Sequence, residues 1–109
     1  MPDLQELLKE LTLEEKAALC SGVTSWQTTP IRRLGIPSIF MADGPHGIRR
    51  EIAGKKVNNI SGSSIPSTCF PPAVTLASSW DRALLYEVGQ ALAEEAKEQG
   101  VSTILGPGI

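Results

Sequence analysis

Residues 81–105, DRALLYEVGQALAEEAKEQGVSTIL, decide the fold class. Asp81 is a favoured helix N-cap, and Gly100 stands where a glycine commonly follows a helix. The apolar run 101–105 comes directly afterwards and predicts a strand. A helix that leads straight into a buried strand is typical of a βα unit, so we predict an α/β protein with a parallel sheet. Leu84, Leu85, Val88, Leu92 and Ala96 recur at helical spacing and are predicted to form the apolar face of this helix.

Two other apolar runs predict strands earlier in the chain. Residues 38–42, SIFMA, are too few for a helix. They do not alternate between apolar and polar residues, which is typical of strands buried on both faces. A short second strand is expected at 73–76, after Pro71-Pro72. Three strands cannot bury themselves in a parallel sheet, and a complete (β/α)8 barrel needs about 250 residues. The chain is therefore predicted to be the front part of a larger α/β barrel or sheet.

The N-terminus predicts two helices before the first strand. Residues 3–10 place leucines on one face, and Thr12 with Glu15 forms a capping box that starts a second helix ending near Cys20. This region has no positive n-region and no uninterrupted apolar run, so we expect neither a signal peptide nor a membrane span. Residues 44–67 show no periodicity and predict a long loop, of the kind that is usually functional or mobile.

Composition excludes several classes of function. The net charge is −2 over 109 residues, and the Arg and Lys pairs, such as Arg32-Arg33, are interpreted as solvated loop charges, so no nucleic-acid partner is expected. Cys20 and Cys69 stand alone beside a single histidine, which predicts no metal site and no cofactor. Two reduced thiols fit a cytoplasmic protein best.

The acidic residues can be sorted by position, because functional groups of a parallel α/β barrel collect where strands end. Asp81 is explained as an N-cap, and only Asp43 and Glu51 lie outside the predicted helices; of these two, Asp43 alone directly follows a predicted strand. The others are interpreted as solvated helix faces: Asp3, Glu6, Glu10, Glu14, Glu15, Glu87, Glu94, Glu95 and Glu98.

Asp43 and Arg49 form the candidate site within MADGPHGIR, residues 41–49. A carboxylate accepts up to four hydrogen bonds, which suits adjacent sugar hydroxyls, and Arg49 adds a fixed fork of donors. The alternative is a structural Asx-turn at Asp43 with Arg49 pairing back onto it, and spacing alone leaves both open. His46 is interpreted as a solvent-exposed turn residue rather than a general base.

The two tryptophans are candidates for stacking on sugar rings. Trp80 directly precedes a helix cap and is interpreted as a packing residue in the manner of a hydrophobic staple. Trp26 lies in a loop and is the better stacking candidate, with a hydrophobic anchor as the alternative.

Three segments in this order resemble the N-terminal portion of glycoside hydrolase family 3, the family of many bacterial β-glucosidases. They are LTLEEKAALCSG (11–22), RLGIPSIFMADGPHGIR (33–49) and STCFPPAVTLASSWDRALLYEVGQALAEEAKEQGVSTILGPG (67–108), and they are most similar to cytoplasmic, thermostable-type enzymes. The resemblance implies that residues 1–109 are the N-terminal portion of a (β/α)8 TIM-like barrel, incomplete in this chain, preceded by helices at about 3–20. It also implies that Asp43 binds hydroxyls of the sugar in subsite −1 and that Arg49 belongs to the same pocket.

The resemblance further implies hydrolysis of terminal β-D-glucosyl residues with retention, on a small β-glucoside or oligosaccharide. Retention needs two carboxylates about 5–5.5 Å apart. The family's aspartate nucleophile and glutamate acid/base are expected outside this chain, so no catalytic residue is expected within it, and the rest of the barrel and the acid/base domain are needed. The alternatives are a non-catalytic carbohydrate-binding module, a structural fragment that assembles with a separate remainder, or β-xylosidase-type specificity.

We therefore predict that the 109-residue chain alone is inactive. Incubated with an aryl β-glucoside, the purified chain should release no nitrophenol above the buffer rate, because the paired carboxylates are not in it. Measurable release that depends on the amount of chain would contradict the prediction.

Overall fold

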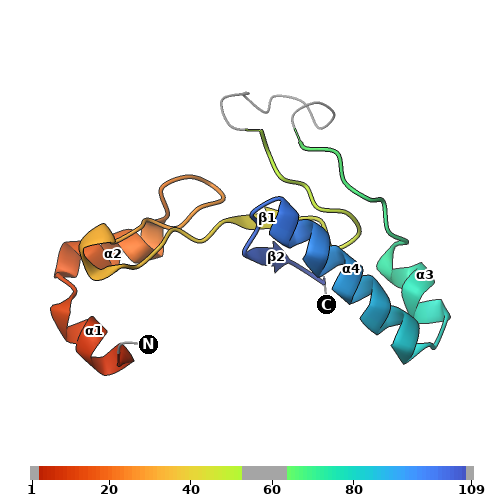
Figure 1. Ribbon diagram of the computed structural model, residues 1–109, viewed down its shortest axis with the longest axis horizontal. Coiled ribbons are helices and arrows are strands. Elements are labelled where there is room, and N and C mark those ends of the chain that lie inside the picture. The colour runs from red at the N-terminus through yellow and green to blue at the C-terminus, as the bar shows by residue number, and fades with distance from the viewer. Residues whose placement is uncertain (1–2, 53–63, 108–109) are drawn as a thin grey trace. The chain divides into compact units, whose positions relative to one another are not determined.

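The computed structural model describes residues 3–52 and 64–107, so the middle of the expected long loop, 53–63, lies outside them. The described elements are α1 (Leu4–Glu10), α2 (Leu13–Ser21), the 3-10 turn η1 (Arg32–Leu34), β1 (Met41–Asp43), α3 (Ala73–Ser78), α4 (Arg82–Glu98) and β2 (Thr103–Leu105) (Figure 1). The chain divides into two compact units at Phe40, each described here by itself. The α/β class is confirmed.

Local capping chemistry defines the two helices of the first unit. Asp3 caps α1 by accepting the Gln5 N–H at 3.1 Å. Thr12 and Glu15 form the predicted capping box at the start of α2: the Thr12 N–H donates to Glu15 Oε2 at 2.9 Å, and the Glu15 N–H donates to Thr12 Oγ1 at 3.2 Å. Gly22, with φ 74°, ends α2. Both predicted N-terminal helices are confirmed.

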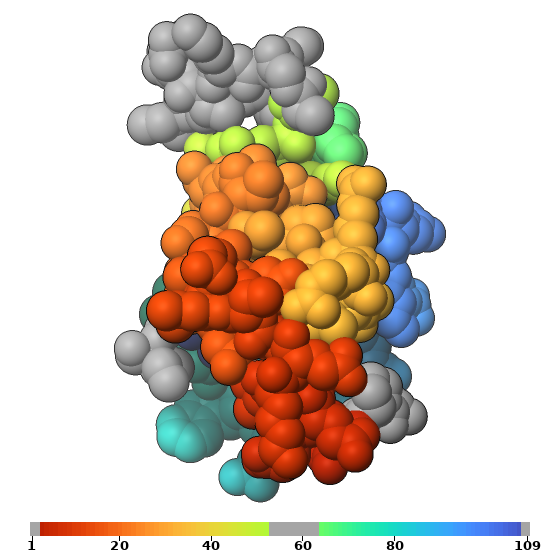
Figure 2. Space-filling model, turned by 90° about the vertical axis from the view of Figure 1, so that its left-hand side faces the viewer, coloured from red at the N-terminus to blue at the C-terminus, as the bar shows by residue number. Residues whose placement is uncertain are grey.

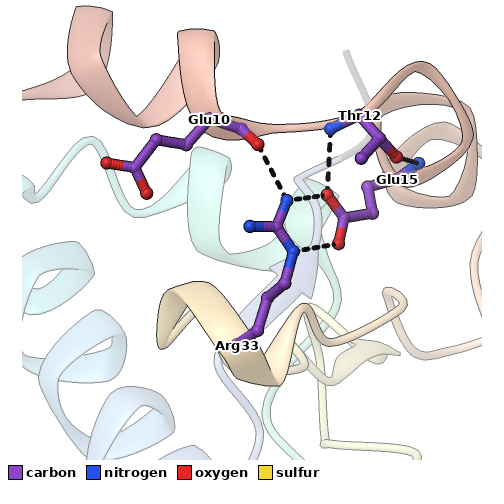
Figure 3. Close-up of polar contacts among 4 residues, drawn as sticks. All are labelled: Glu10, Thr12, Glu15 and Arg33. Atoms are coloured by element: carbon purple, nitrogen blue, oxygen red, sulfur yellow. Dashed lines mark hydrogen bonds and ion pairs between the residues drawn. The ribbon is translucent and has the colours of Figure 1, made fainter.

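Arg33 ties η1 to both helices, which corrects two sequence predictions. Its Nε and one terminal nitrogen donate to the two Glu15 carboxylate oxygens at 2.7 and 2.5 Å, and the same terminal nitrogen donates to the Glu10 carbonyl at 2.7 Å (Figure 3). Arg33 is exposed, as predicted, but it is more than a solvated loop charge because it is ion-paired, and Glu15 is not merely a solvated helix face. The Arg33 guanidinium, and after it the Thr12 N–H, lowers the pKa of Glu15 from 4.5 to about 2.

The first unit has a small core. Leu11 and Ile31 are buried, and Ile31 exchanges backbone hydrogen bonds with Ile36 across the η1 turn. In the space-filling view the side chains of α1, α2 and η1 form one continuous surface (Figure 2). Trp26, in the loop after α2, is half-buried.

A parallel pair of strands is the centre of the second unit. Met41, Ala42 and Asp43 of β1 pair with Thr103, Ile104 and Leu105 of β2. The parallel arrangement is as predicted, and Ala42 is buried at its middle.

The strand β1 is shorter than the predicted 38–42 because the residues before it pair elsewhere. Ser38 Oγ donates to the Thr28 carbonyl at 2.7 Å, and the Ile39 N–H donates to Thr28 Oγ1 at 2.8 Å. The Thr28 N–H in turn donates to the Ile39 carbonyl at 3.0 Å. These bonds hold 38–39 beside Thr28, within the first unit, so the parallel strand begins only at Met41.

The predicted strand at 73–76 is wrong, because these residues begin helix α3. The carbonyl of Pro72 accepts the N–H groups of Thr75 and Leu76 at 2.9 and 3.1 Å, which starts a helical turn. Proline is well suited to this place, since its fixed φ matches the start of a helix. The described residues therefore contain one parallel strand pair rather than three strands.

Helix α4 is confirmed with the predicted cap at its start. Asp81 Oδ1 accepts the N–H groups of Ala83 and Leu84 at 2.9 and 3.1 Å. At the other end Gly100 has φ 67°, and the Val101 N–H donates to the Ala96 carbonyl at 2.8 Å, which turns the chain into β2.

Trp80 does not pack as predicted. It has φ 52° and is 93% exposed, so within the described residues its indole is not a staple on α4. The turn that places it there is held by the Trp80 N–H, which donates to the Ala77 carbonyl at 3.2 Å.

The ends of the expected loop pair with each other. Ser64 bridges Glu51, the Ile65 N–H donates to the Arg50 carbonyl at 2.9 Å, and the Phe70 N–H donates to the His46 carbonyl at 2.8 Å. Residues 64–70 therefore run antiparallel beside 46–51, as the two rising segments in Figure 1 show.

Replacing Gly47 should destabilise the chain, because its φ is 147° and an added Cβ would lie 2.6 Å from the Thr68 carbonyl oxygen. We expect Gly47→Ala to lower the free energy of unfolding by at least about 2 kcal/mol in urea titrations. The matched control is Gly89→Ala inside α4, where a Cβ meets nothing within 4 Å. Gly89→Ala should raise the free energy of unfolding by about 0.5–1 kcal/mol. Equal effects of the two substitutions would contradict the geometry.

The Arg33–Glu15 pair predicts a specific pH dependence. Because the folded pKa of Glu15 is about 2 and its ordinary value 4.5, the stabilisation is complete above about pH 4.5 and is lost as the pH falls toward 2. The Tm difference between the wild type and Glu15→Gln should therefore shrink from about pH 5 to about pH 2. Glu14→Gln, an exposed neighbour, is the control. A Tm difference for Glu15→Gln that stays constant with pH would overturn the assignment.

Candidate functional site

The turn after β1 folds the chain back on itself through its backbone. The Arg49 N–H donates to the Asp43 carbonyl at 2.9 Å, and the Gly47 N–H donates to the Gly44 carbonyl at 3.1 Å. Gly44 has φ 111°, and a Cβ there would collide with the Gly47 carbonyl oxygen. Only glycine fits that position, so the geometry of the turn requires Gly44.

Ile48 anchors this turn in the second unit. Its side chain is only 1% exposed, and it is the largest fully buried side chain in the part of the chain that the structure describes. Its neighbour Arg49 is exposed. An inward isoleucine beside an outward arginine fixes which side chain of the turn is presented to solvent.

The turn lies where the two parallel strands end. Asp43 closes β1 and pairs with Leu105, the last residue of β2. Beyond these residues a Cβ on Gly106 would lie 2.6 Å from Pro45 Cβ, so the segments that follow the two strands touch. The candidate residues therefore lie at the carboxyl edge of the sheet, the position predicted from sequence.

Asp43 and Arg49 are brought side by side as partners of an antiparallel bridge. Residues directly opposite each other in such a bridge project on the same face, with Cβ atoms about 4.5–5.5 Å apart. The structure shows no ion pair between the two side chains, and neither has a hydrogen bond within the described residues. Asp43 is half-buried and Arg49 exposed. Arg49 thus pairs back onto Asp43 through its main chain and not through its guanidinium.

His46 differs from its prediction as an exposed turn residue. It is half-buried, and its Nδ1 is buried with no hydrogen-bond partner in the described part of the chain. Its carbonyl is bound by the Phe70 N–H. The imidazole is thus only partly exposed, with its Nδ1 shielded from solvent.

Glu95 is a residue that the sequence analysis assigned wrongly to a solvated helix face. It is half-buried, and its Oε1 accepts the Thr68 N–H at 2.8 Å. The spacing of the sequence could have predicted this burial. Val88, Leu92, Glu95 and Gln99 recur every three or four residues, so Glu95 lies on the inward face of α4.

The described residues hold no group of three or more His, Cys, Asp or Glu side chains that could bind a metal ion. Cys20 and Cys69 are exposed free thiols. No helix among the described residues has both the length and the apolar character to cross a bilayer.

Known proteins of one enzyme class are similar to this chain in sequence and in structure. No family model matches the chain. The chain is 53% identical over 106 residues to thermostable β-glucosidase B of Acetivibrio thermocellus, covering 97% of this chain and 14% of that protein. It is also 47% identical over 102 residues to an exo-α-(1→6)-L-arabinopyranosidase of Bifidobacterium longum, covering 94% of this chain and 14% of that protein. Both relatives are glycoside hydrolases by name.

Solved structures agree with the sequence relatives. The β-glucosidase of Kluyveromyces marxianus in complex with glucose matches with a TM-score of 0.83 and 42% identity, over 96% of this chain and 12% of that one. The GH3 β-glucosidase of Bifidobacterium adolescentis matches with a TM-score of 0.75 and 43% identity, over 94% of this chain and 13% of that one.

The class is therefore that of the glycoside hydrolases. Over nearly all its length the chain is homologous to β-glucosidases of glycoside hydrolase family 3, and it belongs to that family as a segment of it. The chain spans 14% of the length of each of these two curated relatives.

Proposed function

We propose that this chain supplies one side of the sugar-binding pocket of a β-glucosidase, with Asp43 and Arg49 binding hydroxyls of the sugar in subsite −1. The observation that carries the proposal is the bridge between the two residues at the end of β1. It holds a carboxylate and a guanidinium on one face without pairing them to each other.

The chemistry of the pair suits a sugar ring. A carboxylate accepts hydrogen bonds from two neighbouring hydroxyls, and a guanidinium donates in a fixed fork, so together they recognise adjacent hydroxyls of a pyranose. Contacts of this kind accelerate hydrolysis when they are stronger in the transition state than in the bound substrate.

The rest of the reaction belongs to the longer protein that we propose around this segment. There a barrel of the (β/α)8 type would surround the β1–β2 pair. A nucleophile and an acid/base outside these residues would hydrolyse β-D-glucosides with retention. We further propose a cytoplasmic location, because two exposed free thiols suit a reducing compartment.

A second candidate is an enzyme for α-L-arabinopyranosides. The observation that favours it is the 47% identity to an arabinopyranosidase, not far below the 53% identity to a β-glucosidase. Both substrates are pyranosides with adjacent ring hydroxyls, so the same carboxylate and guanidinium suit either.

A chimera tests these proposals with the residues of this chain in an active setting. In it, this chain replaces the homologous 106-residue stretch of the Acetivibrio thermocellus enzyme. Activity on a nitrophenyl β-glucoside is expected. A folded chimera without activity would contradict the proposal. A shift of at least about tenfold, relative to the parent, toward the nitrophenyl α-L-arabinopyranoside would favour the second candidate, since tenfold is 1.4 kcal/mol of discrimination.

Asp43→Ala in the chimera should lower kcat/KM by about 100-fold or more, because it removes acceptors that act in the transition state. The Tm should hardly change, since the turn is closed by main-chain bonds. The matched control is Asp81→Ala, which removes the α4 cap and should cost about 1 kcal/mol of stability with kcat/KM unchanged. A lowered Tm with unchanged kcat/KM for Asp43→Ala would show that the aspartate only shapes the turn.

A further inference from the structure

Glu95 makes a contact that its place in the helix does not explain. It lies in the last turns of α4, which ends at Glu98, where an acidic side chain opposes the helix dipole. It is nevertheless half-buried, while its neighbour Glu94 is exposed. Glu95 Oε1 accepts the Thr68 N–H at 2.8 Å, and its Oε2 is buried with no hydrogen-bond partner among the described residues.

Thr68 connects Glu95 to the turn that carries the binding pair. The Thr68 carbonyl lies so close to Gly47 that a Cβ there would be 2.6 Å from it. Two residues further on, the Phe70 N–H donates to the His46 carbonyl at 2.8 Å. Residues 67–70 are thus held between the turn on one side and the Glu95 carboxylate on the other.

The end of α4 also contacts the other side of this pairing. An Arg50 terminal nitrogen lies 3.3 Å from the position of a Cβ on Gly100, directly beyond the helix. A cation is favourable there, because the last carbonyls of a helix carry partial negative charge. The helix end therefore touches both antiparallel segments, through Arg50 on one and Thr68 on the other.

We propose that Glu95 is a positioning residue for Asp43 and Arg49. Its charged acceptor holds residues 67–70 against His46 and Gly47, and this fixes the depth and orientation of the turn that presents the pair. A carboxylate makes a stronger bond to a backbone N–H than a neutral acceptor does, which suits the role. The inference rests on the function proposed above for Asp43 and Arg49.

The test uses the chimera and a nearly isosteric substitution that removes the acceptor, Glu95→Met. We expect kcat/KM for the nitrophenyl β-glucoside to fall about tenfold, with the protein folded by circular dichroism at the assay temperature. Glu95→Gln keeps one oxygen for the Thr68 N–H and should stay within about threefold of the wild type. Glu94→Met, on the exposed neighbour, should leave kcat/KM unchanged.

A double-mutant cycle separates positioning from general stability. If Glu95 acts through Asp43 and Arg49, then Glu95→Met should cost clearly less in an Asp43→Ala background than its roughly tenfold loss in the wild type, because residues that act as a unit are not additive. A merely structural role would give the same loss in both backgrounds. Additive losses, or wild-type kcat/KM in Glu95→Met, would overturn the inference.

The outcomes distinguish this inference from the function on which it rests. An unimpaired Asp43→Ala chimera overturns the proposed function and the inference together. An impaired Asp43→Ala beside an unimpaired Glu95→Met overturns the inference alone. If Glu95→Met does not fold, the same cycle is run with Glu95→Asp, whose carboxylate is one methylene short of Thr68 and should give a smaller, still non-additive loss.

Discussion

The second unit depends on one main-chain closure, the hydrogen bond from the Arg49 N–H to the Asp43 carbonyl. The closure requires a backbone without side chains at Gly44 and Gly47, and it is anchored by the burial of Ile48. Because the backbone makes the turn, the two charged side chains are not needed to make it. A turn held together by an Asp–Arg ion pair would have to break that pair before it could bind anything.

Sequence predicted the parts of the structure that depend on local chemistry. The caps at Thr12 and Asp81 act within three residues, so their partners can be found by counting along the chain. The strand β1 could be predicted because Asp43 follows a short apolar run. The strand predicted at 73–76 was wrong because so short a run, with three apolar residues and Thr75, fits a strand and a helix equally well; in the structure it begins α3 after Pro72.

The contacts that sequence could not predict join residues far apart in the chain. Arg33 is 18 residues from Glu15, and Thr68 is 27 from Glu95, so no local rule pairs them. The candidate site was therefore only half predictable. Asp43 and Arg49 follow from the position of a strand end, whereas Glu95 depends on which segment packs against α4.

Two arginines of this chain, Arg33 and Arg49, differ in how their guanidinium groups are bonded. The Arg33 fork is used within the protein, by both oxygens of Glu15 and the Glu10 carbonyl, so a ligand would have to displace three acceptors. The Arg49 guanidinium has no such acceptor within the described residues, whereas its main-chain N–H donates to the Asp43 carbonyl. A guanidinium binds a ligand best when no other acceptor competes for its N–H groups. In the proposed function, fixing Arg49 through its main chain would leave its guanidinium without such competition from the described residues.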